Sequence, residues 1–346
     1  MYLILVFYAN LILTLVLTPF FIIYLTKHEI VDLPGGRRIN TYAVPRMGGV
    51  LVYMTSILSV LIFYGNLDII KYFILGSVII FSLGAVDDVK GVGYKMKFLV
   101  QFIAALLLIT FLSSEYNTLS FFGLNIPAPF DKVLLTVFIV GVMNAINLYD
   151  GLDGLVPGFS LLVSIVTLII GWQLNDKLVL ILSASLIGAL IGFLKYNASP
   201  AKIFLGDSGS LTLGFFLAAT VLLSSRNAGT GNMDLTFSVI LLAVPIIDTL
   251  KVMLIRLKKH RNIFISDMSH VHHIILHCNV NHKATVFILQ GFSLVFAVAA
   301  VLYSGNFAIG LGLFTSIVLL LLFIKNILFG FKRLGEREPA KKYIKV

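Results

Sequence analysis

Charged residues are scarce in this chain of 346 residues, where they make up 12% of the sequence against 59% for hydrophobic residues. The mean hydropathy of +1.01 excludes a soluble single-domain protein, since such a protein could not carry this composition on its surface. A single cysteine, Cys278, excludes an intramolecular disulfide. Inverted or parallel internal repeats are also absent, which removes one usual signature of secondary transporters.

Long apolar segments dominate the sequence instead. A helix needs roughly 20 apolar residues to cross the hydrocarbon core of a bilayer. Segments of about this length lie at approximately 3–26, 48–65, 69–86, 98–113, 133–149, 155–173, 177–196, 208–224, 235–257, 284–304 and 307–329. We therefore predict an all-α polytopic membrane protein with about eleven transmembrane helices, formed by one membrane domain over 1–330 and a basic tail over 331–346. The first segment has no basic flank or small-residue cleavage site, so it is expected to remain as helix one.

The lysines and arginines predict the orientation of these helices. With an external N-terminus, twenty-two of the twenty-six fall on cytoplasmic loops, helix ends or the tail. The remaining four are Lys71, Lys132, Lys177 and Arg226. We expect a multi-pass protein of the cell (inner) membrane with a cytoplasmic C-terminus, and a small external β-hairpin formed by 118–122 and 124–126. The net charge of +10 then reflects topology and not nucleic-acid binding.

Seven of the sixteen acidic residues lie where apolar segments end, and this topology places all seven at the cytoplasmic face. They are Asp87, Asp88, Asp150, Asp153, Asp207, Asp248 and Asp267. Charged groups near a bilayer are costly and are rarely kept without a partner, so this convergence predicts a functional site with metal or phosphate chemistry. Pro245, three residues before Asp248, predicts a kink in its helix.

Polar side chains recur every three residues at the end of the helix expected over 133–149. They are Asn144, Asn147, Asp150 and Asp153. Spacing of three places successive groups near one face of a helix, so they can address one ligand together. A helix end that is merely capped by polar residues is the alternative interpretation.

Two further motifs combine aspartates with features that can bind a cation or phosphate oxygens. The adjacent carboxylates of Asp87 and Asp88 repel each other unless a cation or a basic neighbour intervenes, which suits Mg²⁺, a lysine or proton transfer, although a solvated loop is an alternative. In 204–210, glycines and serines before a helix predict free backbone N–H groups for phosphate oxygens. Asp207 can hold a bridging cation there or serve as an ordinary N-cap.

Three histidines lie within four residues in the loop after the ninth segment. His270, His272 and His273 follow Arg261, but they do not have the i, i+4 spacing of zinc proteases. Imidazole and guanidinium groups donate hydrogen bonds to anionic oxygens. The loop therefore favours recognition of phosphate or sugar over a zinc site.

Together these motifs resemble the polyprenyl-phosphate N-acetylhexosamine-1-phosphate transferase superfamily, and more closely its undecaprenyl-phosphate N-acetylglucosamine-1-phosphate transferase branch. The resemblance spans about residues 27–283 and rests on PRMGG, VDD, NAINLYDGLDG, FLGDSGS and HVHH, in the family's order. It implies transfer of a sugar 1-phosphate from a UDP-sugar to a membrane polyprenyl phosphate with release of UMP, as the first membrane step of an envelope glycan pathway. It also implies Mg²⁺, for which Mn²⁺ substitutes, and a homodimer.

The resemblance implies roles for individual residues. Asp207 corresponds to the metal ligand. The catalytic positions are Asp87, Asp88, Asp150, Asp153 and His272, and the substrate-binding positions are Asn147, Lys97, Arg261, His270, His273 and Arg46. Two alternatives remain at this point, a phospho-N-acetylmuramoyl-pentapeptide transferase and, from another class, an ion-coupled secondary transporter. PRMGG and HVHH favour the N-acetylglucosamine branch.

Overall fold

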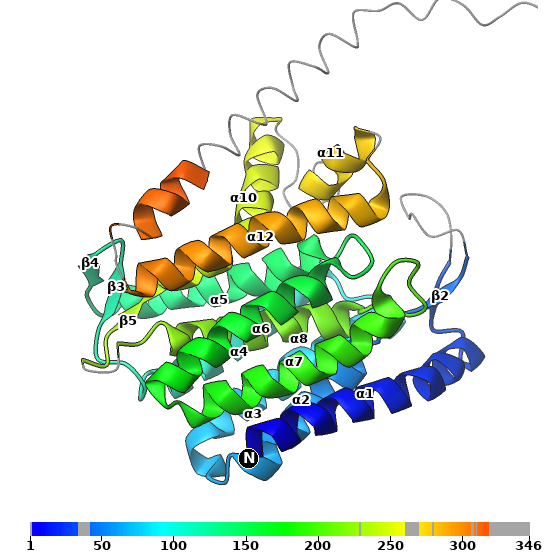
Figure 1. Cartoon of the computed structure of the whole chain (residues 1–346), viewed down its shortest axis with the longest axis horizontal. Helices are drawn as coiled ribbons and strands as arrows, with labels where there is room; N and C mark the ends of the chain where they lie inside the picture. The colour runs from blue at the N-terminus through cyan, green and yellow to red at the C-terminus, as the bar shows by residue number, and fades with distance from the viewer. Residues whose placement is uncertain are drawn as a thin grey trace, which may run out of the picture.

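The computed structural model describes residues 2–33, 42–227, 230–259, 270–278, 280–305, 308 and 310–317. The chain is mainly helical (Figure 1). The first eight helices are α1 (Tyr2–Lys27), α2 (Gly49–Phe63), α3 (Leu67–Lys90), α4 (Tyr94–Leu112), α5 (Phe130–Tyr149), α6 (Leu155–Leu174), α7 (Lys177–Asn197) and α8 (Asp207–Ser224). They are followed by α9 (Leu235–Leu241), α10 (Ala243–Lys258), α11 (Val271–His277) and α12 (His282–Gly305).

Eight helices in the described ranges are long and apolar enough to cross a membrane: α1, α3, α4, α5, α6, α7, α8 and α12. The count becomes nine if α9 and α10 form one bent span, while α2 is apolar but has only 15 residues. The chain is therefore a polytopic α-helical membrane protein. The first ten predicted segments coincide with these helices, and the eleventh, 307–329, lies mostly outside the described residues.

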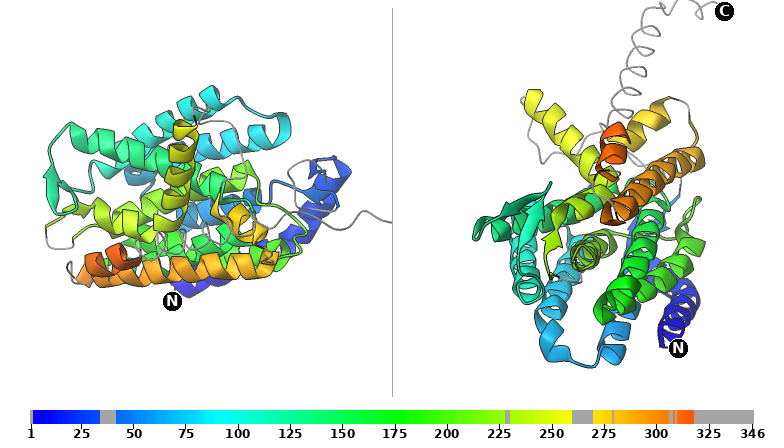
Figure 2. Two further views of the ribbon diagram at one scale, coloured as in Figure 1. Left: turned by 90° about the horizontal axis from the view of Figure 1, so that it is seen from above. Right: turned by 60° about the vertical axis from the view of Figure 1, so that its left-hand side comes forward.

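The ninth predicted segment is two helices and not one kinked helix. The α9 and α10 axes differ by 83°, and the break falls at Leu242, three residues before Pro245. Pro245 instead lies in the first turn of α10. Backbone N–H groups in a first turn have no intrahelical acceptor, so the missing N–H of proline costs no hydrogen bond there. As a result α10 projects out of the bundle, as Figure 1 and the right-hand view of Figure 2 show.

The centre of the bundle is α8, which is buried along almost its whole length. It packs against α2, α3, α5 and α6. At Gly84, α3 approaches α8 so closely that an added Cβ would lie 2.5 Å from the Asp207 carbonyl oxygen. Small residues permit this kind of backbone approach between membrane helices. The contact brings the last turn of α3, with its two adjacent aspartates, against the first turn of α8.

Two small sheets lie at opposite ends of the bundle (Figure 1). Strands β1 (Val31–Asp32) and β2 (Val44–Pro45) pair antiparallel at one end. At the other end β3 (Leu119–Phe121) pairs antiparallel with β4 (Leu124–Ile126), where the sequence predicts a hairpin, and parallel with β5 (Met233–Asp234). The candidate site lies at the end that carries β1 and β2.

Candidate active site

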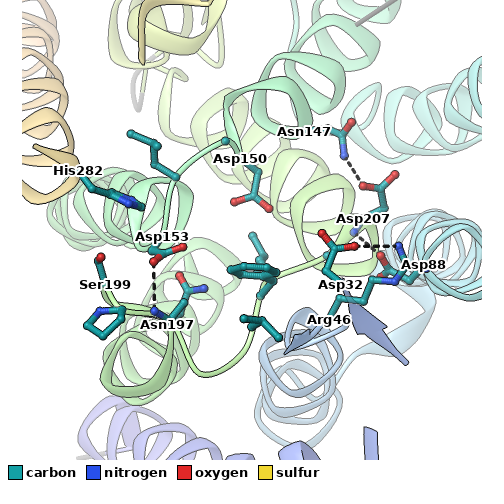
Figure 3. A pocket seen from close by; sticks show the side chains of 18 of the residues that line it. Asp32, Arg46, Asp88, Asn147, Asp150, Asp153, Asn197, Ser199, Asp207 and His282 are labelled. Carbon is teal, nitrogen blue, oxygen red and sulfur yellow. Dashed lines mark hydrogen bonds and ion pairs between the residues drawn. The ribbon is translucent and has the colours of Figure 1, made fainter. Parts of the chain in front are cut away.

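A polar cavity of about 500 Å³ opens where α5 ends and α6 and α8 begin (Figure 3). Five carboxylates line it: Asp32, Asp88, Asp150, Asp153 and Asp207. Its basic and imidazole side chains are Arg46, His273 and His282. Segments far apart in the sequence, from the β1–β2 region to α12, thus contribute to one acidic cavity. Five carboxylates can all be ionised in one cavity only if cations, brought by the ligand or taken from solution, offset their negative charge.

Asp88 is committed to the backbone of α8. Its Oδ1 accepts a hydrogen bond from the N–H of Asp207 at 2.8 Å, and its Oδ2 accepts one from the N–H of Ser208 at 2.9 Å. These are among the N–H groups that a helix start leaves without intrahelical partners. The sequence-based expectation that these two groups are free for phosphate is therefore wrong, because a carboxylate from α3 already occupies them.

Asp207 lies at the centre of a hydrogen-bonded group of side chains. Its Oδ2 accepts from Lys97 Nζ at 2.7 Å, and its Oδ1 accepts from Asn147 Nδ2 at 3.0 Å. The same lysine also pairs with Asp87, so its ammonium lies between two carboxylates. Asp207 is the first helical residue and its side chain does not cap α8, which removes the N-cap alternative. Its carboxylate remains partly exposed to the cavity.

The carboxylate of Asp150 points into the cavity and forms no hydrogen bond or ion pair with the described residues (Figure 3). Burial, together with the negative charges of Asp207, Asp88 and Asp153, raises its pKa to about 8. A lone carboxylate among other acids keeps its proton at neutral pH unless a cation approaches. Asp150 is therefore the acid in the cavity that most requires a positive partner.

Asp153 and Asn197 join the two loops that form the far wall. Asp153 Oδ2 accepts from the N–H of Ala201 at 3.1 Å. Asn197 accepts from the N–H of Gly154 at 3.0 Å and donates to the carbonyl of Ile203 at 2.9 Å. Sequence reasoning missed Asn197, a single amide at the end of α7 that lacks the three-residue repeat of polar side chains around Asn147. These bonds hold the loop after α5 against the loop after α7.

Arg46 and the histidines approach from elsewhere. Arg46 Nη1 lies 3.6 Å from Asp32 Oδ1, and both side chains line the cavity. His273 lines it too, whereas His272 is only 2% exposed and lies beneath Gly151, where an added Cβ would meet its Nε2 at 2.3 Å. Burial, with a smaller contribution from His273, lowers the pKa of His272 to about 3, so its ring is neutral at physiological pH.

Some predicted residues cannot be placed and some lining residues were not predicted. Arg261 and Asp267 lie outside the described residues. His270 is buried and does not line the cavity, because its Nδ1 lies 2.8 Å from Asp248 Oδ2. His282, at the start of α12, lines the cavity without any sequence signal beyond a single histidine before an apolar helix.

The residues present suit a hard divalent cation. No group of three His, Cys, Asp or Glu side chains within the described part of the chain forms a complete metal site. Mg²⁺ rarely needs one, since it usually binds one or two carboxylates together with water and substrate phosphates. Asp207, partly exposed, and Asp150, with its unpaired oxygens, provide such a pair of carboxylates on one cavity. The donor chemistry therefore fits Mg²⁺ bound jointly with a phosphate ligand.

Comparison with known proteins agrees with this chemistry. Residues 70–225 match the model of glycosyl transferase family 4. The chain is 32% identical over 319 residues to the "Probable undecaprenyl-phosphate N-acetylglucosaminyl 1-phosphate transferase" of Bacillus subtilis, covering 91% of this chain and 88% of that protein. The chain belongs to glycosyl transferase family 4. The resemblance drawn from the motifs is confirmed.

Two other relatives bear on the choice within this family. The "Undecaprenyl-phosphate alpha-N-acetylglucosaminyl 1-phosphate transferase" of Thermotoga maritima is 32% identical over 285 residues, 82% of this chain and 86% of that protein. The "Phospho-N-acetylmuramoyl-pentapeptide-transferase" of Caldanaerobacter subterraneus is 34% identical over 221 residues, 59% of this chain and 70% of that protein. The matches to the Bacillus and Thermotoga proteins, over 91% and 82% of this chain, extend further than the match to the Caldanaerobacter protein.

Proposed function

We infer that this protein transfers N-acetylglucosamine 1-phosphate from UDP-N-acetylglucosamine to undecaprenyl phosphate. The products are undecaprenyl-pyrophosphoryl-N-acetylglucosamine and UMP. The observation that carries this inference is the acidic cavity at the helix ends of a family 4 membrane protein, which matches relatives named for N-acetylglucosaminyl 1-phosphate transfer over 91% and 82% of its length. An anionic donor and an anionic acceptor can meet there only if their charges are neutralised.

In this reaction an oxygen of the lipid phosphate attacks the phosphorus next to the sugar. The bond between that phosphorus and the oxygen bridging to the uridine phosphate breaks, and UMP leaves. A monoester phosphate with a second pKa near ~6 is mostly dianionic at neutral pH, so deprotonation of the acceptor contributes little. Positioning and charge neutralisation therefore provide most of the rate.

The side chains divide this work between them. Asp207 and Asp150 would hold Mg²⁺, which when bound supplies positive charge to the pyrophosphate oxygens. Lys97 places a second positive charge between Asp87 and Asp207, and Asn147 orients Asp207 through a hydrogen bond of 3.0 Å. Asp88 holds the first turn of α8 by accepting from the N–H groups of Asp207 and Ser208, so it positions Asp207.

The orientation of the site is part of the proposal. The distribution of lysines and arginines supports a cavity that faces the cytoplasm from the inner membrane. The exposed apolar side chains of α10, among them Leu250, Leu254 and Leu257, suit contact with lipid beside the cavity.

Two alternatives make different predictions. An ion-coupled transporter places its acids near the bilayer midplane in broken helices, whereas here the acids lie at helix ends on one cavity. A muramoyl-pentapeptide transferase would use the same chemistry on a larger donor, and the Caldanaerobacter relative supports that reading. The coverage of this chain by the Bacillus and Thermotoga relatives, 91% and 82%, favours the smaller donor.

The test is an assay of the purified protein in detergent with undecaprenyl phosphate and each radiolabelled donor in parallel. We expect lipid-linked product from UDP-N-acetylglucosamine and none from UDP-N-acetylmuramoyl-pentapeptide. Product from the pentapeptide donor alone would transfer the assignment to the second enzyme. Absence of lipid-linked sugar with both donors would contradict transferase activity.

A further inference from the structure

We propose that Asp248 is a positioning residue, which holds the start of α11 and sets the tautomer of His270, so that His272 supports Gly151 and His273 faces the cavity. The kinetic consequence rests on the proposed function. The structural part concerns only how α11 is attached to α10, and it can be measured without any substrate.

Asp248 uses both carboxylate oxygens on its own chain. Its Oδ2 lies 2.8 Å from His270 Nδ1, and its Oδ1 accepts from the N–H of Val271 at 2.8 Å and from Lys251 Nζ at 3.2 Å. The side chain is only 3% exposed, so it does not face substrate. Val271 is the first residue of α11, and its N–H has no partner within that helix. Asp248 thus caps α11 from a different helix.

The same carboxylate determines which nitrogen of His270 carries a proton. An ionised carboxylate only accepts hydrogen bonds, so the contact requires a proton on Nδ1. In a neutral ring Nε2 is then the acceptor. Asp248 therefore fixes both the position and the hydrogen-bonding character of the first histidine in the loop.

The three histidines carry this restraint to the cavity. The rings of His270 and His272 are stacked, with centroids 5.6 Å apart and planes 13° from parallel. His272 lies directly beneath Gly151, next to Asp150, and the ring of His273 follows at 4.3 Å and lines the cavity. A shift of the α11 start would move all three rings together. Interiors packed this closely transmit such displacements.

The location of Asp248 shows what a buried acid contributes in this helix. It lies on α10, beyond the 83° break, and α10 packs against α5 and α12. Helix α5 ends just before the loop that contains Gly151, and α12 begins at His282. A buried acid in an apolar helix is costly unless it is fully hydrogen-bonded. Here its bonds attach the histidine helix to the scaffold of the site.

The single cysteine provides a native reporter for the structural claim. Cys278 is exposed and directly follows α11, so a nitroxide attached to it reports the mobility of that helix. We expect Asp248→Ala to shift the spectrum of the label toward faster motion. Asp248→Asn keeps an oxygen for the N–H of Val271 but directs an amide N–H at His270. Its label should therefore remain as slow as in the wild type.

Measurements of kcat/KM on the same two variants should distinguish a positioning role of Asp248 from a general loss of stability. Loss of a charge-assisted hydrogen bond corresponds to about a 30-fold fall in kcat/KM, which we expect for Asp248→Ala. Asp248→Asn should lose about 10-fold with no change in label mobility, because only the tautomer of His270 is altered. A variant that fails to fold would leave the other to decide the question.

Asp234 supplies the matched control. It caps α9 through the N–H of Thr236 at 2.9 Å and accepts from the hydroxyl of Tyr303 at 2.7 Å, away from the cavity. Asp234→Ala should keep both a slow label and wild-type kcat/KM. An unchanged label in Asp248→Ala, or wild-type kcat/KM in both Asp248 variants, would overturn the inference. Because the label needs no substrate, a failure of the proposed reaction would be recognised separately.

Discussion

Replacement of Asp88 tests whether this acid works through the structure of α8 or in the chemistry. Asp88→Ala removes the acceptor of two buried N–H groups, those of Asp207 and Ser208. A lost helix cap costs about 0.5–2 kcal/mol, and each buried donor left without a partner costs about 1–3 kcal/mol. Because the two effects overlap, we expect about 2–4 kcal/mol of lost stability. Asp88→Asn keeps one accepting oxygen and should lose about half as much.

The assay combines thermal melting in detergent with UMP release. Both Asp88 variants should lose activity and melt at a lower temperature than the wild type, in proportion to the lost cap. Asp207→Asn should abolish Mg²⁺-dependent UMP release with little change in melting, because its carboxylate is partly exposed. Asp68→Asn, on the exposed first turn of α3, serves as the control. An inactive Asp88→Asn with a wild-type melting temperature would refute the capping role.

Two further predictions concern the loop at the end of α5. In Mg²⁺-free buffer the melting temperature should fall as the pH rises from about 6.5 to about 8, because the folded protein keeps a proton on Asp150 up to a pKa of about 8 and an unfolded aspartate has already lost it. Below about 6.5 the lowered pKa of His272 acts in the opposite direction, since the unfolded histidine binds a proton that the folded one does not. Asp150→Asn should flatten this slope, and a wild-type slope in the variant would show that another group is responsible. Gly151→Ala should lower kcat/KM at least ~10-fold, because the added methyl meets His272 at 2.3 Å. Gly141→Ala, with open space around its added Cβ, should remain fully active; equal activity of both variants would place α11 outside the site.

The helices and the residues at their ends were predictable from the sequence. Segment lengths, apolar composition and polar side chains at the segment ends located α5, α7 and α8 closely, and they identified four of the five acids that line the cavity, all but Asp32. These are local properties of the chain. Helix ends in a membrane protein carry polar groups because the backbone there leaves the hydrocarbon.

The roles of the acids depend on contacts that no local pattern encodes. Asp87 and Asp88 are adjacent in sequence, yet one pairs with Lys97 and the other caps α8. That difference arises because Gly84 lets α3 approach the start of α8. The bond between Asp248 and His270 likewise joins α10 to the residue before α11, and no periodicity in the sequence marks that contact. Tertiary approach, which sequence periodicity does not specify, decides each case.

The position of an isotopic label tests the central claim most directly. UDP-N-acetylglucosamine carrying ³²P in the phosphate next to the sugar, and ³H in the uridine, would be incubated with the protein and undecaprenyl phosphate. The account predicts that ³²P appears in the lipid fraction while ³H is released as UMP. Release of ³H and ³²P together as UDP, with only the sugar on the lipid, would contradict transfer of a sugar 1-phosphate.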